Sequence, residues 1–75
     1  MRRIGRVARI AAGTVVVRSP DDTHPAIGTD VIDERLNRIG RVVDVMGPTE
    51  RPYLVVTPES GEPPAALLNE PVYVR

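Results

Sequence analysis

Residues 39–56 read IGRVVDVMGPTERPYLVV, and this stretch decides the fold because two strand-like runs flank a stiff centre. The runs are 39–46 and 53–57, and β-branched residues dominate both, as they do in pleated sheets. Side chains of a strand alternate between its two faces, so the first run predicts a half-buried strand and the pair predicts a β-hairpin. One face is expected to carry Ile39, Arg41, Val43 and Val45, and the other Gly40, Val42, Asp44 and Met46.

The centre of the hairpin is GPTERP, residues 47–52. Glycine allows backbone angles that other residues avoid, and each proline fixes φ and supplies no N–H, so we expect a rigid, displayed loop. It can be a plain turn with Tyr53 packed on the fold, or a docking surface, because rigid presentation lowers the ordering cost of binding and Tyr and Arg anchor interfaces. The residues alone leave both readings open. The candidate partner-binding residues are Gly47, Pro48, Arg51, Pro52 and Tyr53.

Turn residues divide the rest of the chain into further short strands. We expect strands at 2–11, 14–18, 29–33 and 71–74, the last at a sheet edge. In the first, Ile4, Ala8 and Ile10 are expected on one face; in the second, the run Val15–Val17 predicts burial on both faces. About six short strands predict an all-β fold, a small closed β-barrel or a sandwich.

The connecting segments carry turn and breaker residues. Residues 34–38 are expected as a connection that could hold one helical turn, 58–64 as a proline-rich loop, and 65–68 as one turn of helix. Asn69 is expected in a left-handed turn conformation.

Length and composition exclude several classes of protein. A chain of 75 residues predicts a single domain, residues 1–75. The absence of cysteine excludes a disulfide and a thiolate zinc site. No apolar run reaches membrane-spanning length and arginines interrupt the N-terminal segment, so we expect a cytoplasmic protein. With His24 as the one histidine, no catalytic set, metal site or cofactor site can be assembled, and we expect a protein that is not an enzyme.

Charge is unevenly distributed although the formal net charge is zero. Residues 1–20 hold five arginines and no acid, while 21–34 hold five acids and no Lys or Arg, so the two segments could neutralise each other on the surface. Arg2, Arg3 and Arg6 are candidates for weak RNA contact through phosphates. Tyr53 and Tyr73 are the two aromatic residues, too few for a base-stacking platform.

The central stretch resembles the signature of the Gar-type subunit of H/ACA ribonucleoproteins, a core written IGxVxDVxGPxxxPYxxV. The segments RRIGRVARIAAGTVVVR, IGTDVIDERLNRIG and LLNEPVYVR are similar to the family's first two strands, its lead into the hairpin and its closing strand. Asn69, Val72 and Met46 stand where Gly, Leu and Phe are usual. Gly/Arg-rich tails are absent, which resembles the archaeal form. The most specific matches are Asp44, Gly47, Pro48, Pro52 and Tyr53.

This resemblance implies a closed β-barrel that acts without catalysis as a partner of a pseudouridine synthase. Family members bind the catalytic domain of the synthase, touch guide RNA at most indirectly, and promote loading and turnover of target RNA in ribosomal RNA pseudouridylation. Two rival readings stay open: a generic β-barrel adaptor in ribosome maturation, and a barrel that binds RNA directly. Without its partner, the chain could also self-associate weakly through an unpaired strand edge or the docking face.

Overall fold

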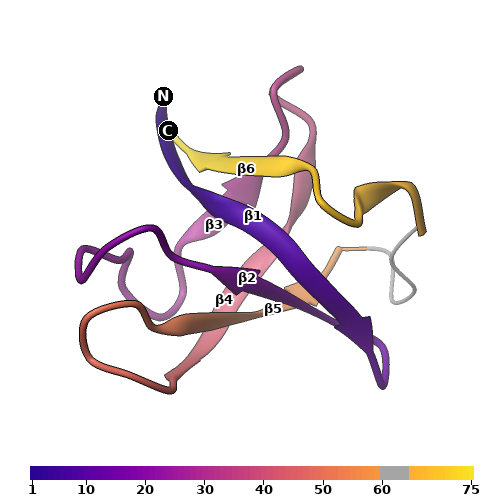
Figure 1. Ribbon diagram of the computed structural model, residues 1–75. Coiled ribbons are helices and arrows are strands. Elements are labelled where there is room, and N and C mark those ends of the chain that lie inside the picture. Colours follow the sequence, from indigo (N-terminus) through magenta and orange to yellow (C-terminus); the bar gives the residue numbers. More distant parts are fainter. Residues whose placement is uncertain (60–64) are drawn as a thin grey trace.

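Six antiparallel strands close into one barrel in the order β1-β2-β5-β4-β3-β6, with β6 returning to β1 (Figure 1). The computed structural model describes residues 1–59 and 65–75. The all-β barrel predicted from the sequence is confirmed. Its elements are β1 Arg2–Ala11, β2 Thr14–Arg18, β3 Asp30–Ile32, β4 Arg38–Met46, β5 Tyr53–Pro58, the short 3-10 helix η1 Ala65–Leu67, and β6 Pro71–Val74.

Barrel closure overturns the prediction that the last strand lies at an edge. β6 pairs with β1 on one side and with β3 on the other. No edge strand remains among the described residues, so the docking face is left as the surface for the weak self-association considered above, which stays a prediction. Of the loop predicted at 58–64, Pro58 belongs to β5, and residues 60–64 lie outside the described part of the chain.

The barrel interior is filled almost entirely by valine, with one isoleucine and one leucine. Val15 and Val17 face this core and are fully buried, while Val16 lies outside the core cluster and is still only 7% exposed, which confirms burial on both faces. Small β-branched side chains suit so narrow an interior. The core cluster consists of Ile4, Val7, Val15, Val17, Val31, Val42, Leu54, Val56, Val72 and Val74.

Two β-bulges change which residues of β1 face inward. The pairing shifts between Arg3 and Gly5 and again between Val7 and Arg9. Val7 is therefore buried and Ala8 exposed, so the predicted face of Ile4, Ala8 and Ile10 is wrong at Ala8. Each bulge inserts one unpaired residue, which turns the two-residue alternation into a three-residue step.

A bulge also interrupts β4, in the stretch on which the sequence analysis began. Val42 pairs with Val56, but the next registered pair is Asp44 with Val55, which leaves Val43 as the extra residue. Val43 is 42% exposed, whereas Val45 packs against the core. The predicted placement of Val43 and Val45 on one face is therefore wrong.

The connection between β3 and β4 is a loop closed by Asp33, without the helical turn considered for 34–38. The Asp33 carboxylate accepts hydrogen bonds from the backbone N–H groups of Arg35 and Asn37, at 2.8 and 2.9 Å. Leu36 adopts φ +69°, which ends any helical path. Asn69 adopts φ +67°, as predicted, and the turn of helix expected at 65–68 is present as η1.

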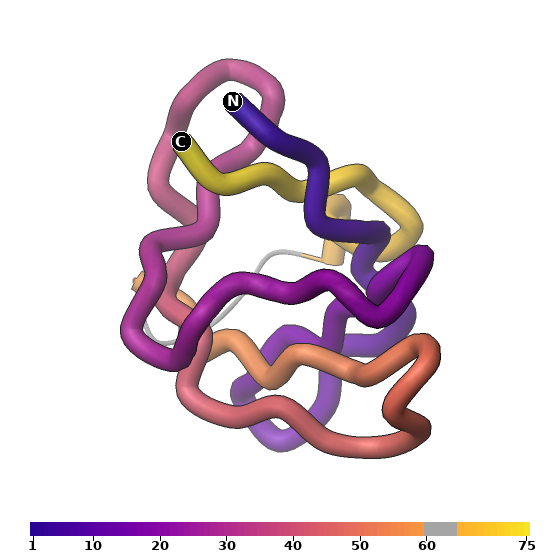
Figure 2. The backbone as a smooth tube through the Cα atoms, turned by 90° about the vertical axis from the view of Figure 1, so that its left-hand side faces the viewer, coloured from indigo at the N-terminus to yellow at the C-terminus, as the bar shows by residue number. Residues whose placement is uncertain are grey.

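The two ends of the chain meet on the barrel. Arg2 pairs with Val74, and Figures 1 and 2 show both ends side by side, far from the loop between β4 and β5. Within the described residues, no helix has the length and hydrophobicity needed to cross a bilayer.

Candidate docking surface

The β4–β5 loop, residues 47–52, is hereafter the docking loop. The hairpin ladder ends at the pair Met46–Tyr53. Gly47 then adopts φ +87°, and a Cβ there would lie 3.0 Å from Cδ2 of Tyr53. Only glycine meets both conditions without strain, so Gly47 lets the chain turn closely over the Tyr53 ring.

The far end of the docking loop is fastened to the end of β2. The backbone N–H of Ser19 donates to the Pro52 carbonyl at 3.0 Å, and Pro52 is buried. Arg18 Nη1 donates to the Tyr53 hydroxyl at 3.1 Å, and its guanidinium carbon lies 5.4 Å from the ring centroid. A cation–π contact and a hydrogen bond therefore fix Tyr53 from the side of β2.

The five predicted partner-binding residues all lie at this end of the hairpin. Gly47, Pro48 and Arg51 are exposed, and Tyr53 is half-buried. Pro52 is buried, so it shapes the loop and offers a partner little surface.

An apolar hollow of about 370 Å³ adjoins the docking loop on the outside of the barrel. Its position follows from pairing, since Arg9, Val16 and Val55 are neighbours across β1, β2 and β5. The sequence pointed to Tyr53 but not to the strand residues beside it, because their convergence depends on the bulged register of β1. The apolar hollow is lined by Ala8, Arg9, Val16, Met46 and Tyr53.

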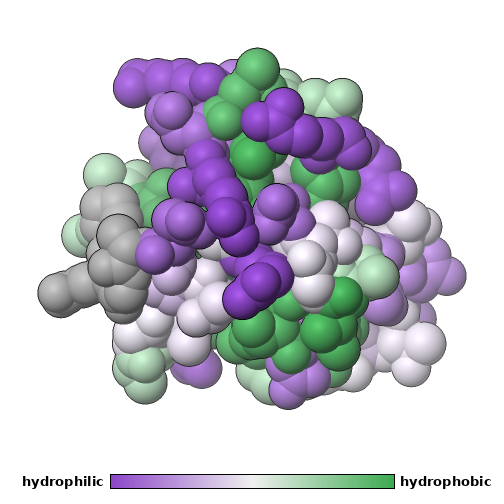
Figure 3. Space-filling view, turned by 180° about the vertical axis from the view of Figure 1, so that it is seen from behind, coloured by the Kyte–Doolittle hydropathy of each residue, from purple (hydrophilic) through white to green (hydrophobic). Residues whose placement is uncertain are grey.

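Two residues of β4 have exposed apolar side chains, and one of them, Met46, also lines the hollow. Met46 is 47% exposed, and Val43, the extra residue of the β4 bulge, is 42% exposed. Figure 3, which views the barrel from behind, shows hydrophobic side chains gathered in the lower part of the view, below a band of hydrophilic ones. Contiguous apolar surface rimmed by polar groups is typical of sites that contact another macromolecule.

His24 lies beside the docking loop. Together with Asp22, Met46 and Pro48, it lines a second hollow of about 340 Å³. Its Nδ1 is 3.0 Å from the Pro25 carbonyl oxygen. No group of three or more His, Asp or Glu side chains in the described residues could hold a metal ion.

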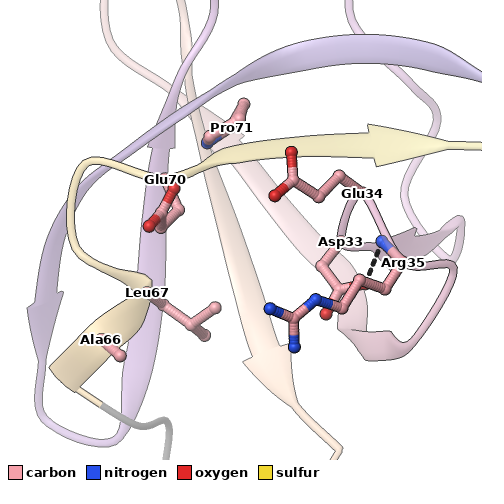
Figure 4. A pocket seen from close by; sticks show the side chains of 7 residues that line it. All are labelled: Asp33, Glu34, Arg35, Ala66, Leu67, Glu70 and Pro71. Atoms are coloured by element: carbon pink, nitrogen blue, oxygen red, sulfur yellow. Dashed lines mark hydrogen bonds between the residues drawn. The ribbon is translucent and has the colours of Figure 1, made fainter.

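The hollow of about 190 Å³ between the β3–β4 loop and η1 carries charges of both signs (Figure 4). Asp33 and Glu34 lie on one side with Arg35, and Glu70 on the other. The Asp33 carboxylate already accepts backbone hydrogen bonds, so it shapes its own loop.

The N-terminal arginines separate into two groups. Arg3 and Arg6 line a common hollow with Arg18 and Arg51, whereas Arg2 is not among its lining residues. No ion pair between residues 1–20 and 21–34, which could have neutralised each other, is found in the described structure, whose ion pairs join Arg38 to Asp30 at 3.0 Å and to Glu59 at 3.2 Å.

A closed barrel with a fastened hairpin loop beside an apolar hollow defines a small β-barrel binding module. The chain belongs to the Gar1/Naf1 family: the family model described as "Gar1/Naf1 RNA binding region" matches residues 1–75. It is also similar to an uncharacterized protein of Methanothermobacter thermautotrophicus, with 31% identity over 78 residues that cover 99% of this chain and 83% of that protein.

Family membership confirms the resemblance noted in the sequence. It supports an RNA-related role of the H/ACA type, in a family of non-catalytic accessory proteins of ribonucleoprotein particles.

Proposed function

We propose that this protein is a non-catalytic H/ACA ribonucleoprotein subunit that binds the catalytic domain of a pseudouridine synthase. In that complex it promotes RNA-guided pseudouridylation of ribosomal RNA by aiding substrate loading and turnover. The setting proposed is the cytoplasm of an archaeal cell, in keeping with the archaeal relative. The observation that carries the proposal is the rigid docking loop placed directly beside the apolar hollow.

Preorganisation is the physical argument for protein docking at this place. The Ser19–Pro52 hydrogen bond and the Arg18–Tyr53 contacts hold the loop in one conformation before any partner arrives. Little conformational entropy is then lost on binding, so a larger part of the free energy of the contacts appears as affinity. Tyr53 and Arg51 are the residue types that most often anchor interfaces, and Met46 adapts to irregular apolar surfaces.

The test is affinity of the purified synthase for variants of the docking surface, measured by calorimetry. Tyr53→Ala removes a central anchor and is expected to weaken binding about 30-fold, and Met46→Ala about 10-fold. Leu36→Ala is the matched control for Met46→Ala, since Leu36 is 52% exposed, close to the 47% of Met46, and lies in the β3–β4 loop. Circular dichroism checks that each variant folds.

Unchanged affinity for both Tyr53→Ala and Met46→Ala would overturn the proposed docking site. A purified synthase–guide RNA complex that gains no multiple-turnover activity from this protein would overturn the proposed role. Recovery of a ribosomal protein and no synthase in affinity purification would favour the adaptor reading instead.

A further inference from the structure

Four arginines from three parts of the chain line one hollow of about 300 Å³, hereafter the arginine hollow. Arg3 and Arg6 come from β1, Arg18 from the end of β2, and Arg51 from the docking loop, and all four are exposed. The arginine hollow therefore gathers positive charge at one place on the barrel. Its remaining lining residues are Gly5, Val7, Ala8, Pro20 and Asn69.

No carboxylate of residues 1–59 and 65–75 lines the arginine hollow. The ion pairs found in this part of the chain both belong to Arg38, so none of them neutralises the four arginines. Like charges brought together on a surface repel one another, and a bound anionic group removes that repulsion. The described part of the protein therefore leaves this positive charge unbalanced.

Two of the guanidinium groups are held in place by neutral partners. Arg6 Nη1 donates to the Asn69 carbonyl at 2.9 Å, and Arg18 Nη1 donates to the Tyr53 hydroxyl at 3.1 Å. A guanidinium has five N–H donors, so each of these groups keeps donors for an incoming anion. Neutral partners orient the two arginines without cancelling their charge.

The arginine hollow adjoins the apolar hollow beside the docking loop. Ala8 lines both hollows, and Arg51 belongs both to the docking loop and to the arginine hollow. Arg18 lies over the ring of Tyr53, and that ring lines the apolar hollow. A partner that covers the apolar hollow therefore brings its neighbouring surface over the four arginines.

We propose that the arginine hollow receives an acidic surface segment of the same protein that covers the apolar hollow. The inference rests on the proposed function, in which that protein is the catalytic domain of the synthase, and it adds the chemistry of the contact. Carboxylates match planar guanidinium groups with paired, charge-assisted hydrogen bonds. Opposite charges beside an apolar contact mainly raise the association rate and fix the register of the two surfaces.

Three observations favour an acidic protein segment over a polynucleotide at this place. The formal net charge of the chain is zero, so the protein as a whole exerts no long-range attraction on a polyanion. Base stacking needs an accessible aromatic face, whereas the Arg18 guanidinium carbon lies 5.4 Å from the centroid of the Tyr53 ring. The lining residues shared with the docking loop and the apolar hollow place the arginines at the edge of a surface suited to a protein.

The test is the rate at which the purified synthase associates with this protein, measured on a biosensor over a salt series. Arg3→Gln/Arg6→Gln removes two of the four charges and leaves the docking loop unchanged. Association at low salt is expected to slow about 10-fold, because complementary charge steers the encounter. The difference from the wild type should shrink to about 2-fold in about 1 M salt, where the Debye length is about 3 Å.

Arg35→Gln/Arg41→Gln is the matched control. Both residues are exposed and line neither hollow, and the formal net charge changes by the same two units. Its association rate should stay within about 2-fold of the wild-type rate, because the lost charges lie away from the contact.

Arg3→Gln alone keeps the test available if circular dichroism shows that the double variant does not fold. The Arg3 side chain makes no hydrogen bond found within the described residues, so this substitution removes a charge and no internal contact. Association of the synthase with Arg3→Gln is expected to slow about 3-fold at low salt.

Equal slowing in the two double variants, or a wild-type association rate in Arg3→Gln/Arg6→Gln, would overturn this inference. Unchanged synthase binding with lost affinity for a labelled oligoribonucleotide would also overturn it, by assigning the arginine hollow to RNA. Met46→Ala removes apolar contact, so it should speed dissociation of the synthase with little change in salt dependence. That result beside unaffected arginine variants would leave the proposed function standing while this inference fails.

Discussion

The backbone of Ser19 stabilises the docking loop, whereas its side chain lowers the stability of the fold. The Ser19 backbone N–H donates a hydrogen bond to the Pro52 carbonyl and so fastens the docking loop. The Ser19 side chain is fully buried. Its hydroxyl has no hydrogen-bond partner in the described structure. A buried hydroxyl without a partner costs about 1–3 kcal/mol relative to its hydrated state. The side chain therefore lowers stability at a point where only the backbone is needed.

Replacing Ser19 with alanine should raise the free energy of unfolding by about 1 kcal/mol, since alanine keeps the N–H and removes the orphaned hydroxyl. Urea denaturation followed by circular dichroism measures this change. Ser19→Val serves as comparison, because added methyl groups in a fully buried position should destabilise the fold by about 1–3 kcal/mol. A lower unfolding midpoint for Ser19→Ala would show that the hydroxyl has a partner after all.

Among the elements, β4 and β5 approach each other closely at Gly40, which pairs with Pro58. A Cβ on Gly40 would overlap the Thr57 carbonyl oxygen. The obstacle is backbone, which cannot rotate aside as a flexible side chain would. The start of the hairpin therefore depends on a missing side chain as much as on the β-branched residues that follow.

Gly40→Ala should destabilise the protein by about 2–4 kcal/mol, because β4 must move away from β5 to admit the methyl group. Gly28→Ala is the comparison: φ there is +96°, but nothing lies within 4 Å of the added Cβ, so only backbone strain of about 1 kcal/mol is expected. Thermal or urea unfolding of both variants shows which substitution lowers the free energy of unfolding more. Equal losses would mean that steric overlap at Gly40 is relieved cheaply.

The strands and the hairpin loop could be predicted from sequence because turn residues and alternation are local signals. The bulges could not, since an extra residue such as Val43 is defined only by the partner strand opposite it. For the same reason, the alternation in β1 predicts the wrong face for Ala8, which follows the register shift after Val7. The docking loop can be predicted as one segment, whereas Arg18 and Arg51 join Arg3 and Arg6 only through the pairing of β1 with β2 and of β2 with β5.

For the whole molecule, the six ladders that close the barrel differ in the number of residue pairs they contain. The β3–β6 ladder has one registered pair, Ile32 with Tyr73, whereas the other ladders have three or more. Each ladder pair adds hydrogen bonds and side-chain contacts, so this seam is the least supported. Local opening should begin there.

Native-state hydrogen exchange, read by NMR, tests this. Amides of β3 should exchange about 10-fold or more faster than those of β2 and β5, which corresponds to about 1.4 kcal/mol lower opening free energy. The barrel would open at the seam while the docking loop stays fastened to β2. Uniform exchange rates in β2, β3 and β5 would instead mean that the barrel opens only as a unit.

The meeting of Arg2 with Val74 has a practical consequence for measurement. Both ends of the chain leave the barrel together, remote from residues 47–52 (Figure 1). Immobilising the protein on a biosensor chip through either end would leave the docking loop turned toward the solution. The orientation would be the same in both cases, so a discrepancy between the two attachments would expose interference by the tag itself.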